Sequence, residues 1–217
     1  MIPVKICGIT SVGNANIAIA NGASAIGLIF YDSSPRKVNI EVAVEIVNFI
    51  NGSVPVIGVF VDEDVDVINS ILGLVKLDIL QLHGRESPQY CQQFKLPIIK
   101  VFRVDSSFDV SILNLFNVSA FLFDTYQKGL PGGTGDSFDW ELVSNFKIET
   151  PIILSGGITS NNIMNGIEVV NPSAVDVNSG VENCPGEKDE MKLGQLFDEI
   201  NLTHGVDNFF KKLMMEV

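Results

Sequence analysis

The chain has 217 residues and a net charge of −12, with 46% hydrophobic and 18% charged residues. This apolar content excludes a disordered chain and fits one large core. The negative charge disfavours nucleic acid and anionic membrane surfaces as partners, because both would be repelled and no run of Lys or Arg offsets it. A small anion can still bind, provided that backbone N–H groups and one or two cations create a local positive site.

The three cysteines are Cys7, Cys91 and Cys184, an odd number without a C-x-x-C pair. This spacing predicts neither a disulfide framework nor a zinc site, and it favours a reducing compartment. The first residues lack the basic and apolar regions of a secretory signal, and no apolar run approaches the roughly 18 residues of a membrane span. We therefore expect a cytoplasmic protein without a bound metal.

Short apolar runs alternate eight times with longer amphipathic ones, as in βα units around a parallel sheet. The expected strands are 4–7, 25–30, 55–60, 78–82, 98–102, 120–124, 152–155 and 174–177. The expected helices are 11–21, 40–51, 64–74, 87–95, 107–116, 139–146, 159–168 and 189–200. Eight pairs in a chain of this length predict the α/β class and a single (β/α)8 TIM barrel over 1–217.

The segment 203–217 is expected to form a helical tail. It places four apolar residues, Phe209, Phe210, Leu213 and Met214, on one side. That pattern predicts a tail that packs on the barrel.

Two residues with acid–base chemistry close apolar strands. Cys7 ends the first strand and Asp124 the sixth, and in this fold the strand ends converge on one pocket. A thiol and a carboxyl group across such a pocket can act as base and acid. The alternatives are that Cys7 fills space in the core and that Asp124 caps a turn.

Glycines follow the seventh and eighth strands, where this fold often binds phosphate. Gly156 and Gly157 follow one strand, and Ser179 and Gly180 follow the other. Glycine allows close backbone approach, so we predict a phosphate site, with ordinary tight turns as the alternative. The glycine-rich segment 126–138, which contains Gly133, is expected to approach a ligand.

Three further positions complete the candidate site. Arg36 follows the second strand and could bind a carboxylate, or it could be solvated. His83 follows the fourth strand and could contact a substrate or only the barrel rim. If Cys7 points inward, Lys5 does too, and a buried ammonium needs a partner, for which the neighbouring eighth strand offers Asp176.

The chain resembles the phosphoribosylanthranilate isomerases of tryptophan biosynthesis. The motifs that carry the resemblance are Lys5-Ile6-Cys7-Gly8-Ile9-Thr10, Ser34-Pro35-Arg36, Gly58-Val59-Phe60-Val61, Gln81-Leu82-His83-Gly84, Gly132-Gly133-Thr134-Gly135, Phe138-Asp139-Trp140, Gly156-Gly157 with Asn162, and Ser179-Gly180-Val181-Glu182 with Pro185-Gly186. Eight motifs in the same order make the resemblance specific.

The resemblance implies an aldose–ketose isomerase that performs an Amadori rearrangement without a cofactor. It implies that Cys7 is the general base and Asp124 the general acid, and that Arg36 lies near the anthranilate carboxylate. It also places the phosphate on the backbone of Gly156, Gly157, Ser179 and Gly180. The implied partner is a small phosphosugar, and the chain is expected to be a monomer or homodimer.

Two rival functions remain at this stage. One is another phosphosugar barrel, such as an epimerase or a thiamine-phosphate synthase. The other is a phosphosugar-binding protein without catalysis, which would need neither Cys7 nor Asp124.

Overall fold

Eight parallel strands form a closed barrel in chain order, with β8 paired to β1. The computed structural model describes residues 2–124, 140–201 and 209–215. The predicted TIM barrel is confirmed, and each strand begins and ends within one residue of the expected range. The strands are β1 (Val4–Ile6), β2 (Ala25–Ile29), β3 (Val56–Phe60), β4 (Ile79–Leu82), β5 (Ile98–Arg103), β6 (Ala120–Asp124), β7 (Ile152–Ser155) and β8 (Ala174–Val177).

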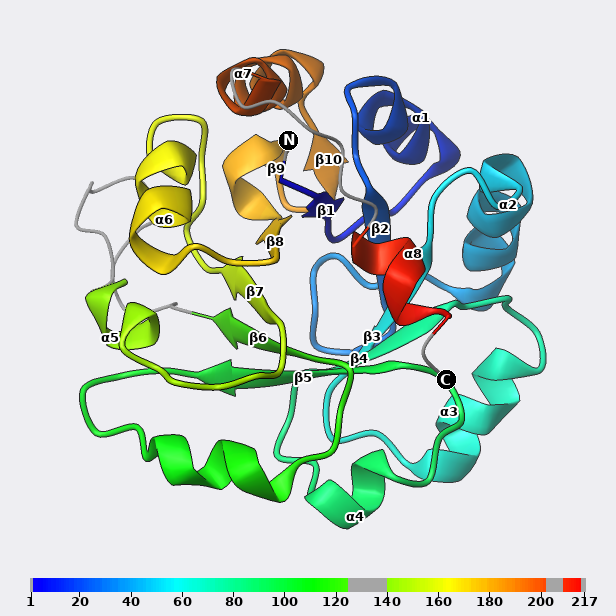
Figure 1. Ribbon diagram of the computed structural model, residues 1–217. Coiled ribbons are helices and arrows are strands. Elements are labelled where there is room, and N and C mark those ends of the chain that lie inside the picture. The colour runs from blue at the N-terminus through cyan, green and yellow to red at the C-terminus, as the bar shows by residue number, and fades with distance from the viewer. Residues whose placement is uncertain (1, 125–139, 202–208, 216–217) are drawn as a thin grey trace.

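Helices surround this barrel (Figure 1). They are α1 (Val12–Ala20), α2 (Ile40–Ile50), α3 (Val65–Leu72), α4 (Pro88–Cys91), α5 (Glu141–Ser144), α6 (Ile163–Val170) and α7 (Glu190–Asn201). Four helix starts are capped, because the side chains of Ser11, Asn39, Asp64 and Ser87 accept backbone N–H groups of the first turn. Within the described ranges, no helix is both long and apolar enough to cross a bilayer.

Three expected helices differ clearly in the structure. The helix expected at 87–95 ends already at Cys91. The range 107–116 contains a 3₁₀ helix, η1 (Val110–Leu115), which buries only Leu113 and so lacks the apolar stripe that favours a longer α-helix. The helix expected at 159–168 begins only at Ile163, because the Asn162 side chain first closes a turn by accepting from the Thr159 N–H.

A short hairpin after β8 was not predicted. A 3₁₀ turn, η2 (Ser179–Val181), leads into β9 (Glu182–Cys184), which pairs antiparallel with β10 (Glu187–Lys188). Gly186 in the connecting turn has φ 88°, which favours glycine. Its carbonyl accepts from Thr10 Oγ1 at 2.6 Å and from Asn14 Nδ2 at 2.8 Å, so the hairpin is held against the start of α1.

A last helix, α8 (Phe209–Leu213), lies over the barrel within the ring of helices (Figure 1). Phe209, Phe210 and Leu213 are buried in one cluster with inward residues near the strand starts. Those residues are Ala25, Ile57, Ile79, Ile99, Ala120, Ile153 and Ala174. The helix Phe209–Leu213 therefore packs on the barrel and closes its N-terminal face, whereas the expected extent of the tail, 203–217, stays a prediction. Met214 departs from the expectation, because it is 40% exposed.

We predict that Phe210→Ala lowers the free energy of unfolding by about 3–5 kcal/mol, because the ring is 1% exposed and its loss leaves a cavity at the barrel opening. Met215→Ala, at a position 82% exposed, is the control and should change stability by less than about 0.5 kcal/mol. Urea unfolding of both variants measures the difference. Equal stability would show that α8 contributes nothing to the barrel core.

Candidate active site

The expected catalytic residues lie at the C-terminal face of the barrel, opposite α8. Cys7 directly follows β1, and its backbone N–H donates to Val177 O of β8 at 2.9 Å. Asp124 ends β6, and His83 directly follows β4. Because parallel strands end on the same face, all three side chains belong to one rim.

A buried ion pair lies below Cys7. Lys5 Nζ is 2.8 Å from Asp176 Oδ1, and the two residues are paired across β1 and β8. The expected partner of Lys5 is therefore present. The adjacent Gly27 makes room for both side chains, since a Cβ there would lie 2.8 Å from Cys7 Sγ and 3.1 Å from Lys5 Nζ.

Burial and charge act in opposite directions on Cys7. Burial raises the pKa of the Cys7 thiol, and although Lys5 opposes this effect, the pKa stays above its ordinary value. Burial alone would lower the pKa of Lys5, but Asp176 and the Cys7 thiolate together raise it. The resting thiol is therefore protonated at neutral pH, beside a stable ammonium.

Asp124 is held by a side chain from β4. His83 Nε2 lies 3.3 Å from Asp124 Oδ2, and His83 Nδ1 lies 3.3 Å from Gln81 Nε2. Gln81 is 1% exposed, and its Oε1 has no hydrogen-bond partner among the described residues. The row from Gln81 through His83 fixes the direction of the Asp124 carboxyl group.

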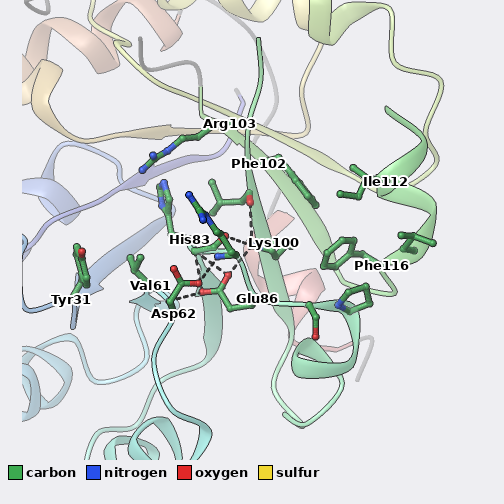
Figure 2. A pocket seen from close by; sticks show the side chains of 16 residues that line it. Tyr31, Val61, Asp62, His83, Glu86, Lys100, Phe102, Arg103, Ile112 and Phe116 are labelled. Atoms are coloured by element: carbon green, nitrogen blue, oxygen red, sulfur yellow. Dashed lines mark hydrogen bonds and ion pairs between the residues drawn. The ribbon is translucent and has the colours of Figure 1, made fainter. Parts of the chain in front are cut away.

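A cavity of about 780 Å³ opens beside this row. Figure 2 shows His83 and Arg103 near its inner side and Ile112 and Phe116 along its outer wall. At its base, Lys100 Nζ donates to Glu86 Oε2 at 2.8 Å. The cavity therefore extends the site outward from His83, and Cys7 is not among its lining residues.

Arg36 reaches the same rim and is bound to Glu182. Its Nε lies 2.9 Å and its Nη2 2.7 Å from Glu182 Oε2, so the carboxylate occupies the side-on edge of the guanidinium. The Arg36 stem passes over Gly8, where a Cβ would lie 2.8 Å from its Cδ. This places the guanidinium next to the strand end that carries Cys7.

The two glycine loops touch each other. Gly156 and Gly157 have φ values of 93° and 65°, and a Cβ at Gly180 would lie 1.9 Å from Ile158 O. This contact leaves no room for a side chain at Gly180, so the backbones of the two loops lie against each other there. Ser179 begins η2, whose first N–H groups have no acceptor within the helix. Gly133 lies outside the described residues.

Comparison with known proteins decides the family. Residues 4–199 match the family model of N-(5'phosphoribosyl)anthranilate (PRA) isomerase. The chain belongs to this isomerase family. Its activity is the isomerisation of phosphoribosylanthranilate in tryptophan biosynthesis.

Individual isomerases of the family match over most of their length. The relative from Pelobacter propionicus is 42% identical over 193 residues, covering 89% of this chain and 92% of the relative. The relative from Geobacter sp. strain M21 is 41% identical over 199 residues, covering 92% and 98%.

Solved structures of family members match as well. The isomerase from Thermotoga maritima has a TM-score of 0.83 at 33% identity, covering 94% of this chain and all of that chain. A second isomerase structure, with a TM-score of 0.78 at 31% identity and the same coverage, is a complex with reduced 1-(o-carboxyphenylamino)-1-deoxyribulose 5-phosphate. Another Thermotoga maritima structure is described as monomers of a dimeric isomerase.

Sequence reasoning assigned no role to Glu182 and Lys188, two charged residues beside the candidate site. Both lie in the unpredicted hairpin, and Lys188 Nζ donates to Glu182 Oε1 at 2.8 Å. The available signal was the Pro185-Gly186 turn, which brings two flanking segments together. A charged residue on each side of a tight turn suggests a cross-strand pair.

Glu182 predicts a specific pH dependence of stability. Burial works to raise the pKa of Glu182, but hydrogen bonds from Arg36 and Lys188 outweigh it and hold the pKa below the ordinary value of 4.5. The ionised Glu182 carboxylate therefore contributes fully to the free energy of unfolding above pH 4.5. This contribution is lost as the pH falls through the lower folded-state pKa of Glu182. Urea unfolding should show Glu182→Gln less stable than the wild type at pH 7, with the gap closing in acid.

The exposed Glu190 on α7 provides the control. Glu190→Gln should follow the wild-type stability curve at every pH. A gap between wild type and Glu182→Gln that persists unchanged below the folded-state pKa would contradict the assignment.

Proposed function

We propose that Cys7 is the general base and Asp124 the general acid of the isomerase reaction. The observation that supports this most directly is their placement on β1 and β6 of one rim, each beside a group suited to its role. Cys7 adjoins the ammonium of Lys5, and Asp124 adjoins His83. An Amadori rearrangement proceeds by proton transfers alone, so no cofactor is required.

In the first step, Asp124 donates a proton to the furanose ring oxygen as the bond from C1′ to that oxygen breaks. The nitrogen lone pair forms the C1′–N double bond, which gives an iminium cation. The heavy-atom positions fit both amide orientations of Gln81. With Gln81 Oε1 facing the Nδ1–H of His83, the lone pair of His83 Nε2 can accept a hydrogen bond from a protonated Asp124 carboxyl group.

In the second step, the Cys7 thiolate removes the C2′ proton. The electron pair of that C–H bond forms the C1′–C2′ double bond and neutralises the nitrogen, which gives an enolamine. Ketonisation then adds a proton at C1′ and removes the proton of the C2′ hydroxyl. Burial raises the pKa of Cys7, so the thiolate must form with substrate present, when the iminium cation and Lys5 both favour it.

The two ends of the substrate are held by different groups. Glu182 occupies the side-on edge of Arg36, which leaves the end-on pair of N–H donors for the anthranilate carboxylate. The phosphate lies against backbone N–H groups of Gly156, Gly157, Ser179 and Gly180, where the glycines permit close approach. Residence in the cytoplasm and assembly as a monomer or homodimer stay predictions.

Cys7→Ser and Asp124→Asn should each lower kcat by on the order of 10²–10⁴-fold while KM changes little. Serine is damaging because an unactivated hydroxyl is a far poorer base than a thiolate. Fluorescence of phosphoribosylanthranilate, followed as it is consumed, measures both constants. Cys184→Ser, at an exposed position, is the matched control and should retain wild-type kinetics. Near-normal kcat in Cys7→Ser or Asp124→Asn would return that residue to a space-filling role.

The phosphate position is tested by Gly157→Ala against Gly52→Ala. Both glycines have positive φ, 65° and 76°, and a Cβ at either meets nothing within 4 Å, so the backbone strain is matched. Only Gly157 lies in a proposed phosphate loop, where a methyl group would displace phosphate oxygens. We expect KM to rise at least about tenfold in Gly157→Ala and to stay unchanged in Gly52→Ala. Equal KM values in the two variants would argue against the site.

A further inference from the structure

Lys188 lies outside the proposed acid–base pair, yet its side chain is fully buried beside the site. Its Nζ donates to Asn178 Oδ1 at 3.0 Å, to Asn178 O at 3.2 Å and to Glu182 Oε1 at 2.8 Å. These acceptors fill the three donor positions of an ammonium. The Lys188 ammonium therefore links two residues of the segment that follows β8, Glu182 and Asn178.

Through its bond to Glu182, Lys188 affects the orientation of Arg36. Glu182 receives Lys188 on Oε1 and Arg36 on Oε2, with the Gly186 N–H also on Oε1 at 3.2 Å. The carboxylate is thereby fixed from three directions, and it in turn orients the guanidinium. The direction of the Arg36 end-on donors depends on Lys188 through Glu182.

Through its bonds to Asn178, Lys188 affects the position of the proposed phosphate loop. Asn178 directly precedes Ser179 and Gly180, and Lys188 holds both its carbonyl and its side-chain oxygen. The side chains of Asn178 and Arg36 both lie against Gly8, where a Cβ would lie 2.7 Å from Asn178 Oδ1 and 2.8 Å from Arg36 Cδ. Gly8 is the residue after Cys7, so the network surrounds the proposed base.

Charge balance gives Lys188 a role beyond pairing. Arg36 and Glu182 already neutralise each other, and Lys5 neutralises Asp176. Lys188 therefore leaves this cluster of five groups with one net positive charge in a protein of net charge −12. A buried excess cation is costly without an anion nearby. A substrate with a phosphate and a carboxylate supplies that anion.

We propose that Lys188 is a positioning residue of the isomerase reaction, whose ammonium fixes Arg36 and the Asn178–Gly180 turn in one geometry around Cys7. This inference rests on the proposed function and adds the group that aligns its two substrate-binding ends. Burial lowers the pKa of Lys188 although Glu182 opposes the shift, and a charged Lys188 lowers the pKa of Cys7. The groups that face Cys7 are Lys5 from β1, Asp176 from β8 and Lys188 from β10.

Lys188→Met tests the proposal, because methionine keeps the length and removes the charge. KM for phosphoribosylanthranilate should rise on the order of tenfold or more, since charge-assisted hydrogen bonds that align both binding groups are lost. The acidic limb of the profile of kcat/KM against pH should move to higher pH, because Cys7 loses a nearby cation. A loss of stability alone would reduce the amount of folded enzyme, and it would change neither KM nor the position of the acidic limb.

Lys192→Met is the matched control. Lys192 lies on α7, and its Nζ donates to the backbone oxygen of Glu182 at 2.6 Å, so this variant removes a cation that contacts the same hairpin without touching the carboxylate. Its KM and pH profile should match the wild type. Lys188→Met with a lower melting temperature but wild-type KM and pH profile would overturn the proposal.

Two further measurements keep the outcome unambiguous. If Lys188→Met does not fold, the double variant Glu182→Gln/Lys188→Met carries the test, because it leaves no unpaired buried carboxylate. The reference for the double variant is Glu182→Gln alone, because Glu182 also orients Arg36 directly. A higher KM and a more strongly shifted acidic limb than in Glu182→Gln support the proposal, and values equal to those of Glu182→Gln overturn it. Full activity of Cys7→Ser would instead overturn the proposed base, whatever Lys188 does.

Discussion

Closure of the barrel between β1 and β8 is the constraint on which the site depends. The register of that closure sets Lys5 opposite Asp176, and the resulting ion pair makes a buried ammonium tolerable at the barrel centre. It also brings the loop after β8 against the end of β1. Cys7, the proposed phosphate loop and the charged hairpin are neighbours because the first and last strands of the ring are hydrogen-bonded.

At the proposed site, local arrangement of charge would allow an acidic protein to bind an anionic substrate. The overall charge of −12 would repel a phosphate at long range, but screening by salt confines that repulsion to about a Debye length. Within the site, Arg36, Glu182 and Lys188 leave a positive excess, and glycine loops add backbone dipoles. Selectivity for an anion is therefore built from a few buried groups.

The strands and the rim residues could be predicted from the sequence because both follow local rules. Apolar runs mark strands buried on two faces, and alternation along β1 placed Lys5 with Cys7. The anchoring of Arg36 could not be predicted, because it needs the tertiary contact that brings Glu182 to it. The 3₁₀ geometry of η1 was also missed, since it depends on how little of that segment is buried. No local pattern encodes either feature.

The helix α8 has a consequence for synthesis of the chain on the ribosome. The inward layer at the strand starts, including Ala25 and Ile99, is complete only when Phe209, Phe210 and Leu213 arrive. These three residues follow the stretch 4–199 that the family model matches. A nascent chain can therefore form all eight βα units and still expose an apolar layer.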